Sequence, residues 1–273
     1  MYLSRLELDL NKRETMRALA SPARFHGAVE SAFPSERAKG QSAIPAADNQ
    51  LSLFADTASE RAARPPVSEA QFSLFGNGTP EAERSRKLWR LDTLHGKTYL
   101  LLLSESRPDL RSADTQFGTG HGGETRDYTT LLGSIHTGDV LRFRLTANPT
   151  VSKAQPRGAD GKKPRGEVKA FLVKREDHKG WFRNLKTWLV RKAEQNGFRL
   201  AEDGFDVMES RWRQFRKGDN RKQSVRFLSV TYEGILVVTD EGAFRSALIS
   251  GIGREKAYGM GLLTVMRTGG AHG

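Results

Sequence analysis

A glycine-rich stretch near the end of the chain contains the residue types that bind a phosphate chain. Residues 251–261 read G-x-G, then five residues, then G-x-G, and Arg254 and Lys256 lie between the two glycine pairs. Each glycine costs backbone entropy, so this density indicates a loop that needs positive φ angles or lets another group approach its backbone closely. Two cations inside such a loop favour phosphate as that group. The candidate binding residues are Gly251, Gly253, Arg254, Lys256, Gly259 and Gly261.

A lone glycine-rich loop is a weak signal, and two well-known phosphate motifs do not fit it. The stretch is no dinucleotide-binding fingerprint, because no strand leads into it and no long helix follows. It is no P-loop either, because no Gly-Lys-Ser/Thr closes it. The apolar residues 262–266 that follow predict a buried last strand.

His26 is the candidate for proton transfer. Ser21 as N-cap and Pro22 at the first helical position predict the start of a helix, and Phe25 and Val29 belong to its apolar face. His26 lies one residue off that face, where a side chain is held in place and still reaches solvent. Imidazole has an ordinary pKa of about 6.5, so it gives or takes a proton near neutral pH. The alternative is a half-packed surface histidine without a chemical role.

Composition favours a polyanionic partner and excludes several other classes. The 273 residues suffice for one large or two ordinary domains, and the net charge of +12 with a pI of about 10.1 favours nucleic acid. The absence of cysteine excludes disulfides, thiolate zinc sites and a cysteine nucleophile. His121 and His136 have no carboxylate or cysteine at metal-ligand spacing, so we expect no metal and no other cofactor. The sequence has neither a signal-peptide core nor an apolar run of membrane-spanning length, so we expect a soluble cytoplasmic protein.

The elements that must position these residues predict an α+β fold of two tandem ferredoxin-like (RRM-like) domains, with a flexible insertion in the first. Strands are expected at residues 2–10, 88–91, 98–103 and 140–145, and again at 205–217, 225–230, 235–238 and 262–266. Helices are expected from residue 22, over 178–196 before Gly197, and over 240–250. Each half then follows the order strand–helix–strand–strand–helix–strand. The expected boundaries are 1–149 for the first domain, 150–170 for a basic connector and 171–273 for the second domain.

Basic residues gather near the tip of a predicted hairpin in the second half. Its strands flank Gly218-Asp219-Asn220, a turn sequence. A solvated charged hairpin is one interpretation. The other is an arm laid against an RNA duplex, with its cations on phosphates and some at base edges. The residues that would make these contacts are Arg213, Arg216, Lys217, Arg221 and Lys222.

Residues 37–85 predict a flexible insertion, because they are rich in Ala, Ser, Glu, Arg and Pro and have little periodic apolar content. Two short pieces recur in this stretch, Gln-Leu-Ser-Leu-Phe at 50–54 and Gln-Phe-Ser-Leu-Phe at 71–75. Exposed Leu-Phe pairs are costly unless they dock on a surface. The pieces resemble the short motif by which bacterial proteins bind the replication sliding clamp. Packing on the protein's own sheet, or a duplicated spacer, is the alternative.

Five signals in a fixed order give the chain a resemblance to a known family. They are the start at residues 1–6 with the helix that opens at Pro22 and contains His26; residues 87–92 (Lys-Leu-Trp-Arg-Leu-Asp); residues 141–149 (Leu-Arg-Phe-Arg-Leu-Thr-Ala-Asn-Pro); Trp188-Leu189 followed by Gly197-Phe198-Arg199-Leu200; and the glycine-rich loop. This series resembles the Cas6 family of CRISPR repeat endoribonucleases, in its type I-E branch (Cas6e, also called Cse3 or CasE). The match covers nearly the whole chain except residues 37–85.

The resemblance implies a metal-independent endoribonuclease that cleaves CRISPR repeat RNA at the base of its hairpin, with His26 as the catalytic residue. In this chemistry the RNA supplies the nucleophile: its 2′-OH attacks the neighbouring phosphate in line, giving a 2′,3′-cyclic phosphate and a 5′-OH. The family also implies two tandem ferredoxin-like domains. Its implied partners are the mature CRISPR RNA, to which the protein stays bound, and the other subunits of the Cascade surveillance complex.

Two positions depart from the family pattern. Family members have a Tyr three residues before this His and a Lys five residues after it, where this chain has Ala23 and Ser31. Arg24, in the same helix, is a candidate auxiliary residue. The departures keep open a second hypothesis, a hairpin-binding Cascade subunit with weak or no cleavage. A generic basic RNA-binding protein explains the charge but not the ordered motifs.

Overall fold

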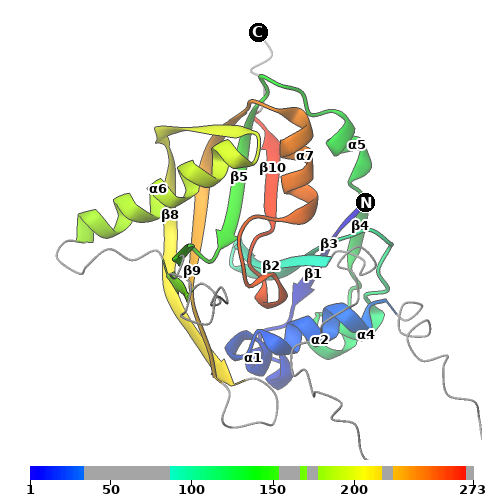
Figure 1. The fold of residues 1–273 in the computed structure, drawn as a ribbon. Coiled ribbons are helices and arrows are strands. Elements are labelled where there is room, and N and C mark those ends of the chain that lie inside the picture. The colour runs from blue at the N-terminus through cyan, green and yellow to red at the C-terminus, as the bar shows by residue number, and fades with distance from the viewer. Residues whose placement is uncertain (34–86, 154–166, 171–177, 217–223, 269–273) are drawn as a thin grey trace, which may run out of the picture. The chain divides into compact units, whose positions relative to one another are not determined.

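The computed structural model describes residues 1–33, 87–153, 167–170, 178–216 and 224–268. Their strands form two four-stranded antiparallel sheets and one two-stranded sheet (Figure 1), so the α+β prediction is confirmed. Met1–Phe33 and Arg86–Gly273 form one compact unit. The predicted insertion at 37–85, with both Gln-containing pieces, lies outside the described residues, as do Lys217, Arg221 and Lys222.

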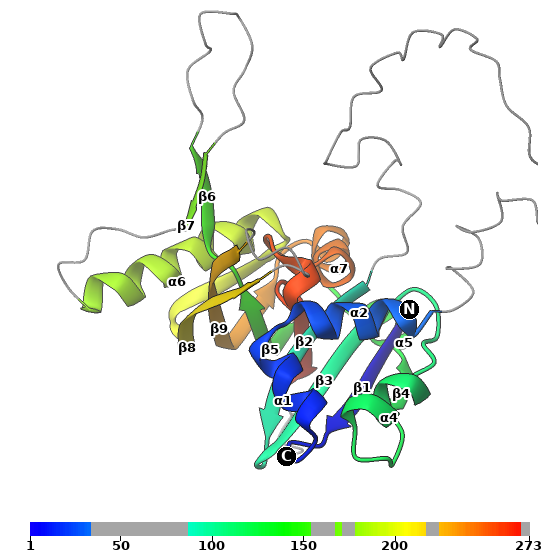
Figure 2. The same cartoon turned by 90° about the horizontal axis from the view of Figure 1, so that it is seen from below.

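The first sheet comes from the N-terminal part of the chain and has the strand order β2-β3-β1-β4. Its elements are β1 (Tyr2–Leu8), α1 (Arg13–Ala20), α2 (Ala23–Ser31), β2 (Lys87–Leu94), β3 (Lys97–Ser104), α4 (Arg111–Phe117) and β4 (Glu124–Asp127). Alternate residues of β1 and β3, such as Leu6 and Leu100, pack under α1, α2 and α4 (Figure 2). Phe25 of α2 contacts Trp89 and Phe117 there, with ring centroids 5.8 and 5.3 Å away. This core holds α2 on the sheet.

The helix that contains His26 begins at Ala23, one residue after the predicted start at Pro22, and Ser21 does not cap it. Ser21 ends α1 instead, and its backbone N–H donates to the carbonyls of Arg17 and Ala18, both at 3.1 Å. The sequence patterns miss α1 because its buried residues, Thr15 and Ala18, are small and leave little apolar periodicity.

The second sheet has the strand order β10-β5-β9-β8. Its elements are β5 (Val140–Ala147), α6 (His178–Gln195), β8 (Phe198–Arg216), β9 (Ser224–Val238), α7 (Glu241–Ser250) and β10 (Leu263–Arg267), and α5 (Thr129–Gly133) leads into it from the first sheet. The expected boundary at 149 puts β5 in the first domain, whereas β5 pairs with β9 and β10. Alternating apolar residues identify a strand but not its partners, so the two sheets divide between β4 and β5.

The stretch expected to be a connector contains paired strands. β6 (Thr150–Lys153) and β7 (Glu167–Ala170) form a separate antiparallel two-stranded sheet. Trp188 of α6 donates from its indole N–H to the carbonyl of Thr150 at 3.1 Å, which ties the start of β6 to the second core.

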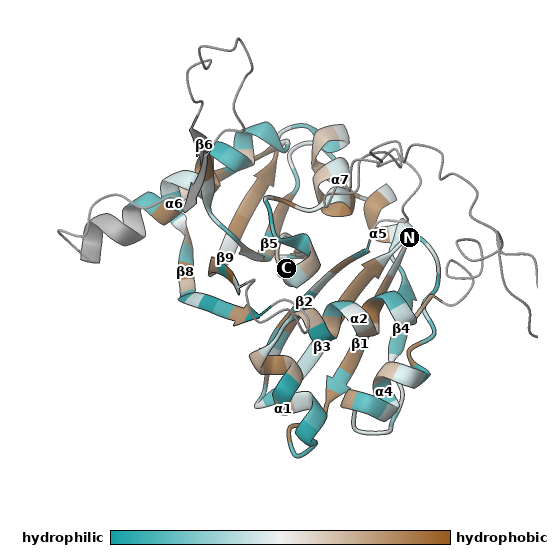
Figure 3. Ribbon diagram, turned by 60° about the horizontal axis from the view of Figure 1, so that its bottom comes forward, coloured by the Kyte–Doolittle hydropathy of each residue, from teal (hydrophilic) through white to brown (hydrophobic). Residues whose placement is uncertain are grey.

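Helices α6 and α7 cover one face of the second sheet (Figure 1). Leu185 and Trp188 of α6 and Phe244 of α7 share a core with Leu141 and Leu145 of β5. The strands beneath these helices are mainly hydrophobic in Figure 3, whereas the outer part of β8 is mainly hydrophilic. The β8–β9 hairpin therefore runs beyond the core and presents polar side chains there. In the described part of the chain, no helix combines the length and the apolar character needed to cross a membrane.

Candidate nucleic-acid interface and active site

His26 is half-buried on one flank of α2. Ala23 precedes it by three residues and Glu30 follows it by four, so the three side chains share that flank. The flank faces the glycine-rich loop, because α2 contacts the 3-10 turn η1 (Lys256–Tyr258) and Ala23 packs against the same apolar cluster as Tyr258 of this turn. The structure therefore brings the helix of the predicted proton-transfer residue against the predicted phosphate loop.

Lys87, the first residue of β2, brings a cation to the same flank. Its Nζ donates to Glu30 Oε2 at 3.0 Å and lies 4.6 Å from the centroid of the Phe33 ring. The Lys87 side chain is 9% exposed, so this ammonium group is held close to the helix rather than in bulk solvent. Glu30 is one turn beyond His26, which places Lys87 near the catalytic candidate.

Arg24 does not lie with His26. Two residues along a helix point in nearly opposite directions, and the Arg24 guanidinium forms an ion pair with Glu14 of α1 at 3.4 Å. Ser31 also faces away, and its hydroxyl donates to the carbonyl of Ala28 at 2.9 Å. The auxiliary role of Arg24 stays a prediction, and the contact with α1 does not support it, because helical geometry turns this side chain toward α1.

The glycines of residues 251–261 are required by the loop's own packing. All four have φ between 72° and 90°. A Cβ on Gly251 would lie 2.9 Å from the carbonyl oxygen of Gly261, and one on Gly259 would lie 2.7 Å from the Trp89 ring. The Gly261 carbonyl also accepts the N–H of Ile252 at 2.9 Å, which closes the loop. The close approach that the glycines permit is thus to Trp89 and to the loop itself, while Arg254 between them is exposed.

An aromatic cluster joins the glycine-rich loop to the β8–β9 hairpin. Tyr258 lies edge-on to Phe215 of β8, with ring centroids 4.9 Å apart, and stacks with Phe227 of β9 at 6.0 Å. Met260 and Ala23 complete the contacts. The basic hairpin and the helix of His26 therefore share a packed junction.

The predicted RNA-binding residues of β8 point to two opposite faces of the hairpin. Arg213, in register with Phe227, faces the first sheet, whereas Arg216, in register with Ser224, faces the other way. On the face of Arg216, Arg226 lies over the ring of Trp212 at 4.5 Å from its centroid. Arg216 and Arg226 are exposed and Arg213 is half-buried. One hairpin therefore offers two chemically different surfaces.

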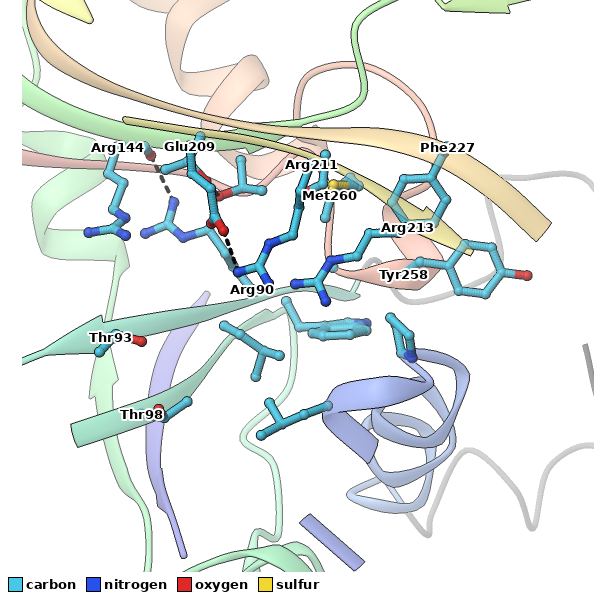
Figure 4. A pocket seen from close by; sticks show the side chains of 18 residues that line it. Arg90, Thr93, Thr98, Arg144, Glu209, Arg211, Arg213, Phe227, Tyr258 and Met260 are labelled. Carbon is cyan, nitrogen blue, oxygen red and sulfur yellow. Dashed lines mark hydrogen bonds and ion pairs between the residues drawn. The ribbon is translucent and has the colours of Figure 1, made fainter. Parts of the chain in front are cut away.

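A cleft of about 360 Å³ lies between β2 of the first sheet and the β8–β9 hairpin of the second (Figure 4). Its walls include Arg144, Arg211 and Arg213, and Tyr258 and Gly259 of the glycine-rich loop stand at one side. Figure 4 shows the guanidinium groups of Arg211 and Arg213 directed into the cleft and the Tyr258 hydroxyl directed away from them.

Burial and neighbouring charges perturb three groups around this region. Burial, reinforced by the charge of Arg211, lowers the pKa of Arg213. Burial raises the pKa of Glu255 in the glycine-rich loop, against the opposing effect of Arg254. Burial, with a contribution from Glu255, raises the pKa of Tyr258. Shifts of this kind gather at functional sites.

The sequence patterns miss Lys87, Arg211 and Arg144 as site residues. Lys87 donates a hydrogen bond to Glu30, which lies 57 positions earlier in the sequence, and no local sequence pattern predicts such a contact. Tyr258 could have been singled out, because it lies inside the glycine-rich stretch. Within the described residues, no group of three or more His, Cys, Asp or Glu side chains is arranged to hold a metal ion.

Comparison with known proteins supplies a family match and a similar protein. The chain matches the family model described as "CRISPR associated protein" over residues 70–267. It is 28% identical over 194 residues to the CRISPR-associated endoribonuclease Cse3 of Thermus thermophilus, an overlap that covers 68% of this chain and 82% of that protein.

Solved structures agree at the level of the fold. The structure of CRISPR endoribonuclease Cse3 bound to a 19-nucleotide RNA matches with a TM-score of 0.62 and 24% identity, and the match covers 97% of this chain and 100% of that one. A chain of a CRISPR RNA-guided surveillance complex in a pre-nicking state matches with a TM-score of 0.54 and 22% identity, over 98% and 100% of the two chains.

Proposed function

The chain belongs to the CRISPR-associated protein family, as a type I-E Cas6e-like member, and from this premise we propose that it is an endoribonuclease that matures CRISPR RNA. It cleaves the repeat RNA at the base of its hairpin, without a metal ion, and remains bound to the product. The observation that supports the proposal is the contact of α2, the helix that contains His26, with the turn of the glycine-rich loop, on a chain with a net charge of +12.

The reaction needs no nucleophile from the protein. The 2′-oxygen of the RNA forms a bond to the adjacent phosphorus and loses its proton, while the bond from phosphorus to the 5′-oxygen breaks and that oxygen gains a proton. The products are a 2′,3′-cyclic phosphate and a 5′-OH. The protein must hold the attacking oxygen in line, transfer protons and stabilise charge on the phosphate.

Side chains of the described structure suit these tasks. His26 transfers one of the two protons. The ammonium group of Lys87 stabilises the charge that builds up on the phosphate, taking the place expected of a Lys at position 31. Tyr258, in the turn that contacts α2, brings a hydroxyl that has no hydrogen-bond partner within the described residues.

The basic β8–β9 hairpin is the proposed RNA-binding arm. Arg216 and Arg226 stand exposed on one face of it, suited to the phosphates and base edges of the repeat hairpin. Lys217, Arg221 and Lys222 follow in the sequence. Cations such as Arg216 and Arg226, exposed on paired strands, give an affinity that falls with salt.

The order strand–helix–strand–strand–helix–strand in each half supports two tandem ferredoxin-like domains, divided between Asp127 and Val140. The similarity to a chain of an RNA-guided surveillance complex supports a further proposal, that this protein stays on the mature RNA as a subunit of Cascade.

A second candidate function is a hairpin-binding Cascade subunit with weak or no cleavage. It is favoured by Ala23 and Ser31, since neither offers a side chain that stabilises charge, and by the turn of Arg24 away from His26. The presence of Lys87 and Tyr258 beside α2 favours the enzyme.

The test is incubation of the purified protein with its cognate repeat RNA in EDTA, beside a His26→Ala variant. We expect the wild type to release a 2′,3′-cyclic phosphate product. The variant should lose at least about 100-fold in single-turnover rate, as is usual for a proton-transfer residue, and bind the RNA as tightly as the wild type.

His136→Ala is the matched control, because His136 is exposed and lies at the opposite end of the first half from α2 in sequence. It should cleave like the wild type. Tight binding without cleavage by all three proteins would establish the second candidate function. Equal cleavage by wild type and His26→Ala would remove His26 from the mechanism.

A further inference from the structure

Within the described residues, the ion pairs around the cleft leave one arginine without a carboxylate of its own. Arg90 pairs with Asp92, Arg144 with Glu233 and Arg211 with Glu209. Arg213 forms no ion pair there although it is half-buried, and the charge of Glu209 that acts on it is already paired with Arg211. Removing a guanidinium group from water without pairing it is costly, so this arrangement calls for an anion from outside the chain.

The neighbourhood of Arg213 is suited to phosphate. Arg211, two residues before it on the same strand face, directs a second guanidinium group into the cleft (Figure 4). Arg guanidinium groups present a planar fork of donors that matches phosphate oxygens. The hydroxyl of Ser229 lines the same cleft and can meet ribose or a further phosphate oxygen, whereas the hydroxyls of Thr146 and Thr231 are bonded to each other at 2.9 Å.

The size of the cleft and the aromatic side chains along one side of it favour single-stranded RNA as the ligand over a base-paired stem. About 360 Å³ accommodates a group of nucleotide size, since ligand pockets begin at about 300 Å³. Phe227 and Tyr258 border the cleft, and a positively charged groove with aromatic side chains is the usual platform for single-stranded nucleic acid. A base-paired stem has both strands occupied and cannot place one nucleotide into such a space.

The cleft is continuous with the active-site candidate. Pro22 and Gly259 both line it; Pro22 stands four residues before His26, and Gly259 ends the turn that contacts α2. A strand that leaves the reaction site at His26 can therefore pass directly into the cleft.

We propose that this cleft is a second RNA site, which holds a phosphodiester of the single strand next to the repeat hairpin through Arg211 and Arg213, while the opposite face of the β8–β9 hairpin holds the duplex. The assignment rests on the proposed function, because it takes CRISPR repeat RNA as the ligand. The hairpin arm thus contacts two parts of one RNA, a stem on the face of Arg216 and a flank on the face of Arg213.

The experiment measures the affinity of the full-length protein for two RNAs, the minimal repeat hairpin and the same hairpin with its natural single-stranded flanks. We expect the wild type to bind the flanked RNA about tenfold more tightly, the gain typical of one or two phosphate and stacking contacts. Arg213→Gln should abolish this gain, so that the variant binds the two RNAs with the same affinity.

Three further variants complete the test, so that loss of folding cannot be mistaken for loss of the site. Arg216→Gln, on the opposite face of the same strand, should weaken binding of both RNAs by the same factor. Glu209→Gln frees Arg211 from its partner and should tighten binding of the flanked RNA alone, an increase that a misfolded protein cannot produce. Arg199→Gln, exposed at the far end of β8, controls for the loss of one charge and should change neither affinity.

The outcomes separate this inference from the function on which it rests. Equal affinity of the wild type for both RNAs, or an equal effect of Arg213→Gln on both, would overturn the second site and leave the proposed function standing. Binding of neither RNA would overturn both. A fluorescent mononucleotide distinguishes the source of the phosphate: if it binds at the cleft while the flanks give no gain, the ligand is a free nucleotide and the RNA assignment is wrong.

Discussion

Arg90 and Asp92, two residues apart on β2, form a bidentate ion pair in which Nε and Nη2 of the arginine donate to the two carboxylate oxygens at 2.8 and 2.7 Å. Nη1 donates to the carbonyls of Arg144 and Leu262, and Nη2 also donates to Thr264 Oγ1, each at 2.8 Å. All five N–H donors of a side chain that is 1% exposed are therefore used. They tie the edge of the first sheet to β5 and to the segment that follows the glycine-rich loop.

Arg90→Met should lower the free energy of unfolding by about 3 to 5 kcal/mol, because it takes the donor from two backbone carbonyls and leaves Asp92 with only its ion pair to Arg144. Urea unfolding measures the change. Arg17→Met is the control, since Arg17 pairs with Glu14 in a half-exposed position and should cost less than about 1 kcal/mol. Similar costs for the two variants would mean that Arg90 does not hold the two sheets together.

Gly259→Ala should destabilise the protein and slow RNA cleavage more than Gly138→Ala does. Both glycines have positive φ, 81° and 95°, so both substitutions carry the same kind of backbone strain. The added methyl at 259 would also lie 2.7 Å from the Trp89 ring, whereas at 138 it meets no atom within 4 Å. We expect about 1 kcal/mol for Gly138→Ala and about 3 kcal/mol for Gly259→Ala by thermal or urea unfolding. Equal losses of unfolding free energy in the two variants would show that the Trp89 ring moves aside at no cost in stability.

Tyr258→Phe should leave stability nearly unchanged and reduce the single-turnover cleavage rate about tenfold, because it removes the hydroxyl and keeps the ring against Phe215 and Phe227. Tyr258→Ala should lower both, since it also opens the junction between the hairpin and α2. If Tyr258→Phe cleaves at the wild-type rate, the Tyr258 hydroxyl has no part in cleavage and the residue serves only to pack the junction.

Stability should fall at high pH through Tyr128, whose hydroxyl is buried. Burial raises its pKa from 10.0 to about 12, so the unfolded chain releases this proton first. Between these two values the folded state binds more protons, and stability decreases as the pH rises. Tyr128→Phe should reduce that loss by about 2 kcal/mol in urea unfolding at a series of pH values. Parallel profiles for the two proteins would contradict the assignment.

The two Gln-containing pieces at 50–54 and 71–75 predict binding to the bacterial sliding clamp. Phe54→Ala or Phe75→Ala alone should weaken capture of the purified clamp, and the double variant should abolish it, because two linked motifs reinforce each other. RNA cleavage should be the same for all four proteins. Failure of the wild type to capture the clamp would end this hypothesis.

Local features could be predicted from the sequence, and contacts between distant segments could not. The density of glycine in 251–261 is visible in the sequence, but Leu88 and Trp89, which crowd Gly251 and Gly259, come from a strand far earlier in the chain. Alternation along β8 separates Arg213 from Arg216. Only the pairing with β9 and the position of β2 show that Arg213 faces a cleft.

The same limit applies to Arg24 and to β5. Helical spacing alone turns Arg24 away from His26, whereas Lys87, which takes the position near His26, is reached only through the fold. The sequence of β5 predicts a strand, but it does not predict the partners, because β9 and β10 lie much later in the chain. Strand identity is local and sheet membership is not.

The contact of Lys87 with Phe33 also bears on how this protein gains and loses sequence. The two residues flank positions 34–86 and contact each other, so the two ends of the segment that joins them lie side by side. Closing a loop between touching ends costs only about 0.6 kcal/mol more for each doubling of its length. Evolution can therefore lengthen, shorten or replace that segment almost without thermodynamic consequence. A recruitment motif or a reporter domain can enter the chain there while the helix of His26 keeps its place.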